Sequence, residues 1–418
     1  MLNLFAENHI VILGLLLLGG FWAGKSISLL KLPSITGFVL GGIVMGYSVM
    51  NIIQEPMIHQ LRFIEAIGLS LVALIIGGDL NNKRLHRLGR SITIITMVQA
   101  LGAFLAVTLS TCWLLGIPLH TALLLGAISS ATAPAATVAV VHEYKAHGPL
   151  VDTLMAIVAL DDAVCVILFS IAMAISGALL SGSFHGFSWS HLGEPFYEIG
   201  GSIVFGVLVG LLVIFTLRRT KERHEIVVIL LGFAFLAGEI GEIFGFSALL
   251  LNMTYGYMVA NFGPKGHIMD LLQDVELPIL ICFFTLAGAT LNLHILLENW
   301  AAATLFVAAR AFGKVAGSYA GGKISHASEH VKKYLGFAML PQAGVAIALV
   351  LAINEEYPQI APLVTAIVLA SVTVNEIIGP LGTKYAITAS GEGGRHKSEA
   401  IVSHALGSEP HMDSDSFR

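Results

Sequence analysis

Two adjacent aspartates lie in the middle of a long apolar segment, where a charged side chain needs a specific reason to be present. Asp161 and Asp162 occur in the run MAIVALDDAVCVILFS. Placing an ionisable group at the centre of a membrane helix costs about 2.5–3.5 kcal/mol on insertion scales, so such residues are functional candidates. Neighbouring helix positions point about 100° apart. One carboxylate can therefore meet a partner while the other faces a cavity.

A lysine in a second apolar segment can supply the countercharge for one aspartate. Lys314 lies in ARAFGKVAGSYAGG, whose small residues let a helix approach its neighbours closely. Either Lys314 takes part in transport or it forms a purely structural ion pair. Arg310 lies one helical turn earlier on roughly the same face. Two alternatives stay open for Arg310: it snorkels toward an interface, or it pairs with Glu239 or Glu242.

Proline interrupts two other apolar segments. The first, SSATAPAATVAVV, has Pro134 near its centre together with the hydroxyl residues Ser130 and Thr132. The second, MLPQAGVAIA, contains Pro341 and Gln342. Proline removes a helical hydrogen bond and leaves carbonyl groups free. A simple kink explains either segment alone, but two interrupted segments beside charge-bearing ones favour broken helices that cross at a midplane site.

The overall composition places these residues in a membrane. Of 418 residues, 56% are hydrophobic and 12% are charged, whereas soluble domains carry about 25% charged residues. The chain cannot cover a water-facing surface of this size, which excludes a soluble enzyme and a disordered protein. A nucleic-acid-binding protein is excluded as well, because it would need basic patches. The composition predicts an all-α polytopic membrane protein.

The elements that must position the charged residues are membrane-spanning helices, each of which needs roughly 20 mostly apolar residues. Thirteen apolar runs are predicted to cross the membrane. They are about 9–30, 34–50, 64–80, 91–116, 120–142, 150–180, 196–217, 225–245, 247–263, 275–296, 300–322, 334–354 and 360–387. The polar tail, residues 388–418, is expected to be disordered and cytoplasmic.

The distribution of basic residues orients this arrangement. All lysines and arginines outside the predicted spans lie on one side of it, except Arg62. The excess of positive charge marks the cytoplasmic side, so the N-terminus is predicted outside and the C-terminus inside. A broken span followed by an acidic one occurs in each half, the second acidic span carrying Glu376 in TVNEIIGP. We therefore predict inverted-topology repeats, although Glu376 can also simply anchor its helix.

The stretch TAPAATVAVVHEYKAHGPL, followed by ALDDAVCVILF, resembles the cation–proton antiporter superfamily of sodium/hydrogen exchangers, and more closely its electrogenic, two-aspartate branch. LPSITGFVLGGIVMG, FFTLAGATLN and FGKVAG add to the similarity, which covers residues 9–387. The resemblance implies a transporter domain over residues 1–387. Its mobile core helices would lie at about 120–180 and 300–387, and its dimerisation helices at about 1–50 and 196–263.

The same resemblance implies a role for each candidate residue. Asp162 becomes the main carboxylate that binds the cation and the proton. Asp161 becomes the partner of Lys314, while Thr132 and nearby carbonyls complete the cation site. Many relatives carry an aspartate after this threonine, where this chain has Ala133. That departure leaves the ligands at the crossover open.

The function expected from these features is antiport of a monovalent cation, Na+ foremost and Li+ or K+ as alternatives, against protons by alternating access. The protein is expected to be a homodimer in the plasma membrane (the inner membrane of a bacterium). We expect it to use no cofactor and not to act as an enzyme or bind nucleic acid. A sodium-coupled symporter of an organic anion is the alternative, because broken helices also bind anionic substrates. The roles of Arg310, Glu239 and Glu376 stay open.

Overall fold

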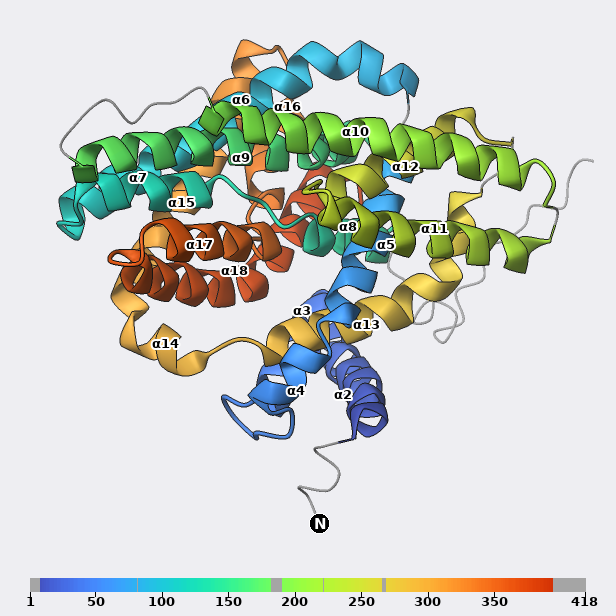
Figure 1. Ribbon diagram of the computed structural model, residues 1–418, viewed down its shortest axis with the longest axis horizontal. Coiled ribbons are helices and arrows are strands. Elements are labelled where there is room, and N and C mark those ends of the chain that lie inside the picture. The colour runs from blue at the N-terminus through green and yellow to red at the C-terminus, as the bar shows by residue number, and fades with distance from the viewer. Residues whose placement is uncertain (1–7, 81, 182–189, 221, 265–267, 394–418) are drawn as a thin grey trace, which may run out of the picture.

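The computed structural model describes residues 8–80, 82–181, 190–220, 222–264 and 268–393, and these fold into helices joined by short turns (Figure 1). Within this part of the chain, β pairing is limited to an isolated bridge between Gly46 and Ile53. The fold is therefore all-α, as the composition predicts.

The first half of the described chain contains eight helices that precede or carry the aspartate pair. They are α2 (His9–Leu29), α3 (Ser34–Met45), α4 (Glu55–Gln60), α5 (Phe63–Asp79), α6 (Asn82–Leu114), α7 (Leu119–Ser129), α8 (Pro134–Glu143) and α9 (Pro149–Ser181). The first predicted broken span is thus two helices, α7 and α8. The aspartates lie in α9.

The second half contains the helices that carry Lys314, the second break and Glu376. They are α10 (Ser190–Leu217), α11 (Arg223–Ile243), α12 (Ala248–Phe262), η2 (Met269–Leu272), α13 (Gln273–Ala289), α14 (Leu293–Glu298), α15 (Trp300–Ile324), α16 (Glu329–Ala338), α17 (Gly344–Glu356) and α18 (Ala361–Ser390). The second predicted broken span is also two helices, α16 and α17.

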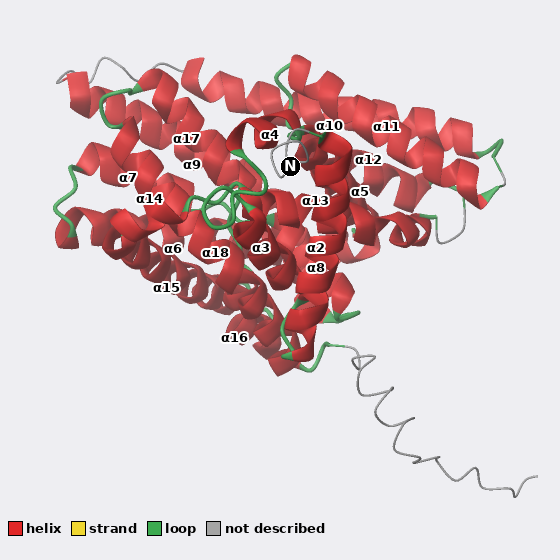
Figure 2. Ribbon diagram, turned by 90° about the horizontal axis from the view of Figure 1, so that it is seen from below, coloured by secondary structure: helices red, strands yellow, loops and turns green. Residues whose placement is uncertain are grey.

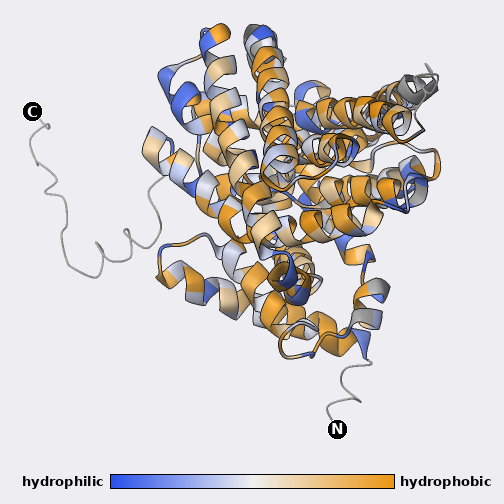
Figure 3. Cartoon of the chain, turned by 90° about the vertical axis from the view of Figure 1, so that its left-hand side faces the viewer, coloured by the Kyte–Doolittle hydropathy of each residue, from blue (hydrophilic) through white to orange (hydrophobic). Residues whose placement is uncertain are grey.

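Seven helical segments of the described chain are long and apolar enough to cross a membrane by themselves. They are His9–Leu29, Gly89–Leu114, Leu119–Glu143, Pro149–Leu180, Phe196–Leu217, Arg223–Ile243 and Ala361–Ser390. Large apolar side chains such as those of Trp113, Ile243 and Phe312 are exposed. Hydrophobic residues, drawn in orange, occur along most of the helices (Figure 3). A surface of this kind suits lipid. The full set of thirteen crossings and the inverted repeats stay predictions.

The helices pack in two groups, and α9 contacts members of both, α6 in one and α10 in the other. In Figure 2, α10, α11 and α12 lie together on one side of the molecule, away from α7 and α15. In one group, α15 packs against α6, α16 and α18. In the other, α12 packs against α5 and α10, while α3 packs against α2 and α13. The first group contains the predicted core helices and, in addition, α6. The second group contains the predicted dimerisation helices and, in addition, α5 and α13.

Glycine brings α6 and α15 into backbone contact. A Cβ atom on Gly313 would lie 2.5 Å from the carbonyl oxygen of Gly102, and one on Gly317 would lie 2.7 Å from the Cα of Gln99. No larger residue fits at these positions unless the helices separate. The close approach matters for function because it brings Gln99 of α6 and Lys314 of α15 into the same part of the core.

The C-terminal helix runs three residues beyond the predicted boundary at 387. It ends at Ser390, where Gly391 adopts a left-handed conformation with a φ of 75°. The carboxylate of Glu392 then accepts hydrogen bonds from the backbone N–H groups of Leu150 and Val151 at the start of α9, at 2.8 and 2.9 Å. The first residues of the predicted tail are therefore ordered by capping α9. Residues 394–418 lie outside the described part of the chain.

Candidate ion-binding site at the helix crossover

The two helix breaks contact each other in the interior of the protein. Residues 130–133 separate α7 from α8, and residues 339–343 separate α16 from α17. The backbone N–H of Ala133 donates a hydrogen bond to the carbonyl of Pro341 at 2.9 Å. Pro134 occupies the first turn of α8, where its missing N–H costs no helical hydrogen bond. The prolines thus mark the breaks, and each break supplies free backbone groups to the crossover.

Arg310 binds the carbonyl groups at the ends of α7 and α16. Its buried guanidinium donates to the carbonyls of Ser129 at 3.0 Å, Ala131 at 2.7 Å and Leu340 at 2.6 Å. Helix C-termini carry unsatisfied carbonyls and a partial negative charge, which a cation stabilises. Both interpretations made from the sequence are therefore wrong: Arg310 does not snorkel, and it does not pair with Glu239 or Glu242, whose side chains are exposed on α11.

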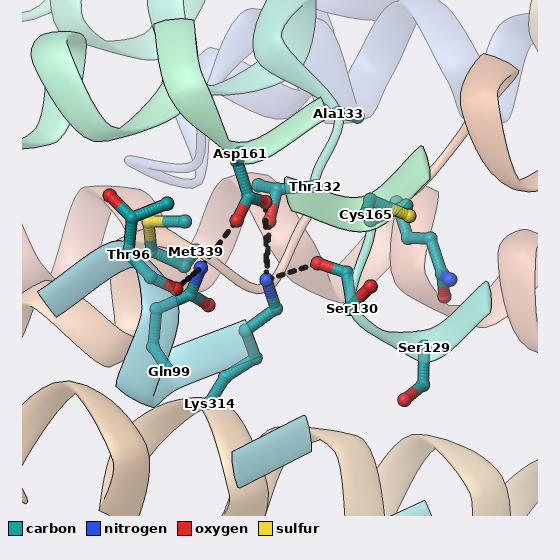
Figure 4. A network of polar contacts seen from close by, with 12 residues as sticks. Thr96, Gln99, Ser129, Ser130, Thr132, Ala133, Asp161, Cys165, Lys314 and Met339 are labelled. Atoms are coloured by element: carbon teal, nitrogen blue, oxygen red, sulfur yellow. Dashed lines mark hydrogen bonds and ion pairs between the residues drawn. The ribbon is translucent and has the colours of Figure 1, made fainter. Parts of the chain in front are cut away.

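Lys314 joins the first break to the aspartate pair (Figure 4). Its ammonium group donates to the carbonyl of Ser130 at 2.5 Å, to the hydroxyl of Thr132 at 2.8 Å and to Oδ2 of Asp161 at 3.2 Å. An ammonium group has three N–H donors, so these three acceptors satisfy it completely. The lysine and the aspartate are both fully buried, which makes this a buried ion pair.

Asp161 also has a partner that the sequence interpretation missed. The side-chain amide of Gln99 donates to Oδ1 of Asp161, and it also donates to the carbonyl of Thr96 at 3.1 Å (Figure 4). With Lys314 on its other oxygen, Asp161 is bonded through both carboxylate oxygens. A lone glutamine in an apolar run is the signal that could have identified Gln99, because polar residues at membrane depth are rare and specific.

Asp162 lies in a different environment from its neighbour. Both of its carboxylate oxygens are inaccessible to solvent and have no hydrogen-bond partner among the described residues. Asp162 lines a cavity of about 20 Å³ together with Glu198 of α10 and Ser247 at the start of α12. A cavity needs roughly 10–15 Å³ to hold one water molecule. The site therefore has room for one water-sized occupant, and Thr132, which bonds Lys314, is not among the residues that line it.

The second break is connected to the last helix by amide groups. Gln342 donates to the carbonyl of Ile128 at 3.0 Å and accepts from the side chain of Asn375 at 2.9 Å. The next residue, Glu376, is 3% exposed, and its carboxylate oxygens have no hydrogen-bond partner in the described part of the chain. The resulting chain of bonds links α18 to the end of α7.

A larger cavity of about 650 Å³ lies further toward the start of α9. His142, at the end of α8, contacts a carboxylate of α5 and one of α13 there, at 3.0 Å from Asp79 and 3.1 Å from Glu276. Met155 and Ala156 line this cavity, whereas Ala159 and Asp162 line the small one. The two cavities therefore follow each other along α9, about one helical turn apart.

Known proteins show similarity over most of the chain. It is 22% identical over 293 residues to the ammonium/H(+) antiporter subunit AmhT of Alkalihalophilus pseudofirmus, covering 68% of this chain and 69% of that protein. It is 21% identical over 397 residues to the high-affinity Na(+)/H(+) antiporter NhaS3 of a Synechocystis species, covering 84% of each.

A solved structure shows the same fold. The sodium proton antiporter MjNhaP1 of Methanocaldococcus jannaschii superimposes with a TM-score of 0.67 at 21% sequence identity, covering 98% of this chain and 100% of that one. A second structure of the same protein gives a TM-score of 0.71. The family described as the transmembrane sodium/hydrogen exchanger matches residues 13–384. A match of this extent shows that the chain belongs to the sodium/hydrogen exchanger family.

Proposed function

We propose that the protein exchanges a monovalent cation for protons across a membrane, and that both ions bind in turn to Asp162. One contrast within the aspartate pair carries this proposal. Asp161 has both carboxylate oxygens bonded, whereas those of Asp162 face a small cavity without a hydrogen-bond partner among the described residues. A carboxylate without a partner in a buried position is costly unless it binds a cation or a proton.

Competition for Asp162 couples the two ions. When the site meets a solution poor in protons, the ionised carboxylate offers oxygen ligands to an alkali cation, which prefers hard oxygen donors. When it meets a more acidic solution, protonation removes the charge and expels the cation. Only the loaded states are expected to reorient, because an empty charged site is too costly to move through an apolar barrier. Movement of the core helices against the dimerisation helices would give alternating access.

The size and charge of the cavities favour a small cation over an organic anion. The cavity at Asp162, about 20 Å³, accommodates one small ion. Carboxylates outnumber basic groups around the larger cavity, which disfavours an anion. The acidic residues that line it are Asp79, Glu143, Asp152 and Glu276, and the basic ones are Lys145, His142 and His147. For this reason antiport is proposed in preference to sodium-coupled symport. Sodium is the cation we expect foremost, and the likeness to an ammonium/H(+) antiporter adds ammonium to Li+ and K+ as alternatives.

Lys314 is proposed as the second proton carrier, which would make the exchange electrogenic. Lys314 releases a proton when its ion pair with Asp161 is broken, and it takes up a proton again when the ion pair re-forms. Exchange of two protons for one cation moves net charge. The proposal includes a homodimer in the plasma membrane with the N-terminus outside.

The test of Asp162 measures proton release from reconstituted vesicles with a pH-sensitive dye after Na+, Li+, K+ or ammonium is added. The wild type is expected to respond to at least one of these cations, and Asp162→Asn to none. Glu242→Gln, an exposed carboxylate on α11, is the matched control and should behave as the wild type. Cation-dependent proton release that survives in Asp162→Asn would refute the assignment.

The test of Lys314 measures charge movement on a solid-supported membrane. Lys314→Met is expected to keep cation-dependent proton exchange but to lose the transient current. The transient current is divided by the exchange rate of the same variant. If this ratio in Lys314→Met equals that of the wild type, Lys314 is only a structural partner of Asp161.

A further inference from the structure

Glu198 lies on α10, opposite the aspartate pair, and forms the other acidic wall of the small cavity. The cavity is enclosed by three helices: α9 contributes Asp162, α10 contributes Glu198, and the start of α12 contributes Ser247 and two leucines. Two carboxylates from two different helix groups therefore share a space of about 20 Å³. The exchange described above uses only one of them.

The small cavity lies on the side of Asp162 that is opposite to the large cavity, and Glu198 lines it there. The large cavity is lined by residues of α9 up to Ala156, whereas the small cavity runs from Ala159 through Asp162 to Val166. The small cavity thus extends from the aspartate toward the end of α9, which is the end at which α10 begins. In this structure Asp162 shares its cavity with Glu198 rather than with the carboxylates of the large cavity.

A hydrogen-bonded serine holds the wall that carries Glu198 in position. The hydroxyl of Ser202, one turn further along α10, donates to the carbonyl of Glu198 at 2.6 Å and accepts from the backbone N–H of Ser247 at 2.9 Å. This bond ties α10 to the turn that precedes α12. The backbone position of Glu198 beside the cavity is therefore fixed by contacts that do not involve its carboxylate.

The charges of the two carboxylates explain what the pair can do. Two ionised carboxylates at one small buried cavity repel each other strongly. Binding of a cation or a proton relieves this repulsion, so the pair has a higher affinity for either ion than a single carboxylate has. We propose that Glu198 is a second ion-binding carboxylate, which relays the transported cation and proton between Asp162 and the solution at the end of the bundle where α10 begins. This inference rests on the proposed antiport.

The relay step for the proton conserves charge. The O–H bond of a protonated Asp162 breaks and a new O–H bond forms on the ionised carboxylate of Glu198, directly or through one water molecule. Asp162 is then ionised and ready for a cation, and Glu198 passes its proton to the solution. The cation moves the opposite way, from an ionised Glu198 to an ionised Asp162.

The experiment compares the two faces of the protein. Cation-dependent proton flux is measured in right-side-out and in inverted vesicles, with Na+ as the probe and the apparent KM determined on each face. Glu198→Gln keeps the size of the side chain and removes its charge. We expect the apparent KM on the face near the start of α10 to rise about tenfold, equivalent to about 1.4 kcal/mol, with the KM on the other face unchanged. Glu198→Asp, which restores the charge, should recover most of the affinity.

Controls separate this inference from the proposed function. Glu242→Gln removes an exposed carboxylate of α11 and should leave the KM unchanged on both faces. An equal change on both faces in Glu198→Gln, or none on either, overturns the relay while the antiport stands. A wild-type protein that shows no cation-dependent proton flux overturns the antiport itself.

Discussion

Replacing Lys314 by methionine tests the buried ion pair most directly, because methionine keeps much of the volume and removes the charge. The change leaves Oδ2 of Asp161 without its cation and removes a donor from the carbonyl of Ser130 and from the hydroxyl of Thr132. Breaking a buried pair by removing one partner costs about 3–5 kcal/mol. Each buried polar group left without a hydrogen bond adds about 1–3 kcal/mol.

We therefore expect Lys314→Met to lower the free energy of unfolding by at least about 4 kcal/mol at neutral pH. Asp161→Asn should also destabilise the protein, because it leaves the lysine charge buried beside neutral acceptors. The double variant contains neither charge. It should be more stable than the sum of the two single effects predicts, by about 3 kcal/mol, since only hydrogen bonds then remain unmade.

The free energy of unfolding is measured by reversible titration of the purified protein in mixed micelles with sodium dodecyl sulfate, for the wild type and the three variants. Gln99→Leu provides a comparison that removes a neutral donor from the same carboxylate, and it should cost less than Lys314→Met. If the two single effects add to within about 0.5 kcal/mol, the side chains are energetically independent. That result would refute the assignment of a buried ion pair.

Three further predictions concern the ions, the crossover and the helix packing. Competition at Asp162 implies that protons displace the cation, so the apparent cation KM in vesicle flux assays should be constant at high pH and rise about tenfold per unit once the pH falls below the pKa of the site. Arg310→Lys should lower the thermal midpoint of the detergent-solubilised protein nearly as much as Arg310→Met, because lysine cannot reproduce the planar fork that reaches three carbonyls. Gly313→Leu would place a Cβ atom 2.5 Å from the carbonyl oxygen of Gly102. Separation of α6 from α15 should abolish folded expression, measured by gel filtration, whereas leucine at the open position Gly14 should be tolerated.

The parts of the site that could be predicted from the sequence are those where a residue violates a strong rule. An unpaired charge is costly in an apolar run, so a lysine in one run and an aspartate pair in another indicate an ion pair, and Lys314 and Asp161 lie 3.2 Å apart. The prolines marked both helix breaks because proline cannot continue a helix without losing a hydrogen bond. Such rules depend on the local sequence, so these features can be predicted without knowledge of the packing.

The partners of Arg310 could not be predicted, because they are backbone carbonyls. Every residue has a carbonyl, and only the three-dimensional crossover selects those of Ser129, Ala131 and Leu340. Glu198 was missed for a related reason. It lies eight residues after the start of a helix, where a carboxylate is unremarkable, and only the packing of α10 and α12 against α9 brings it to the cavity of Asp162.

The charges at the crossover constrain how the exchange can be electrogenic. Arg310 and Lys314 bring two positive charges, and Asp161 brings one negative charge, so an ionised Asp162 makes the group neutral overall. Binding of either a proton or a monovalent cation to Asp162 then produces the same net charge, and a one-for-one exchange leaves it unchanged. In an electrogenic exchange, the second proton would have to come from another group at the crossover. Arg310 cannot supply it because guanidinium groups keep their proton in proteins. Lys314 is the remaining positive group, and it can become neutral only if Asp161 moves away or is itself neutralised. A local change within the core that releases Asp161 from Lys314 would therefore couple the second proton to access switching, whereas binding at Asp162 alone would not.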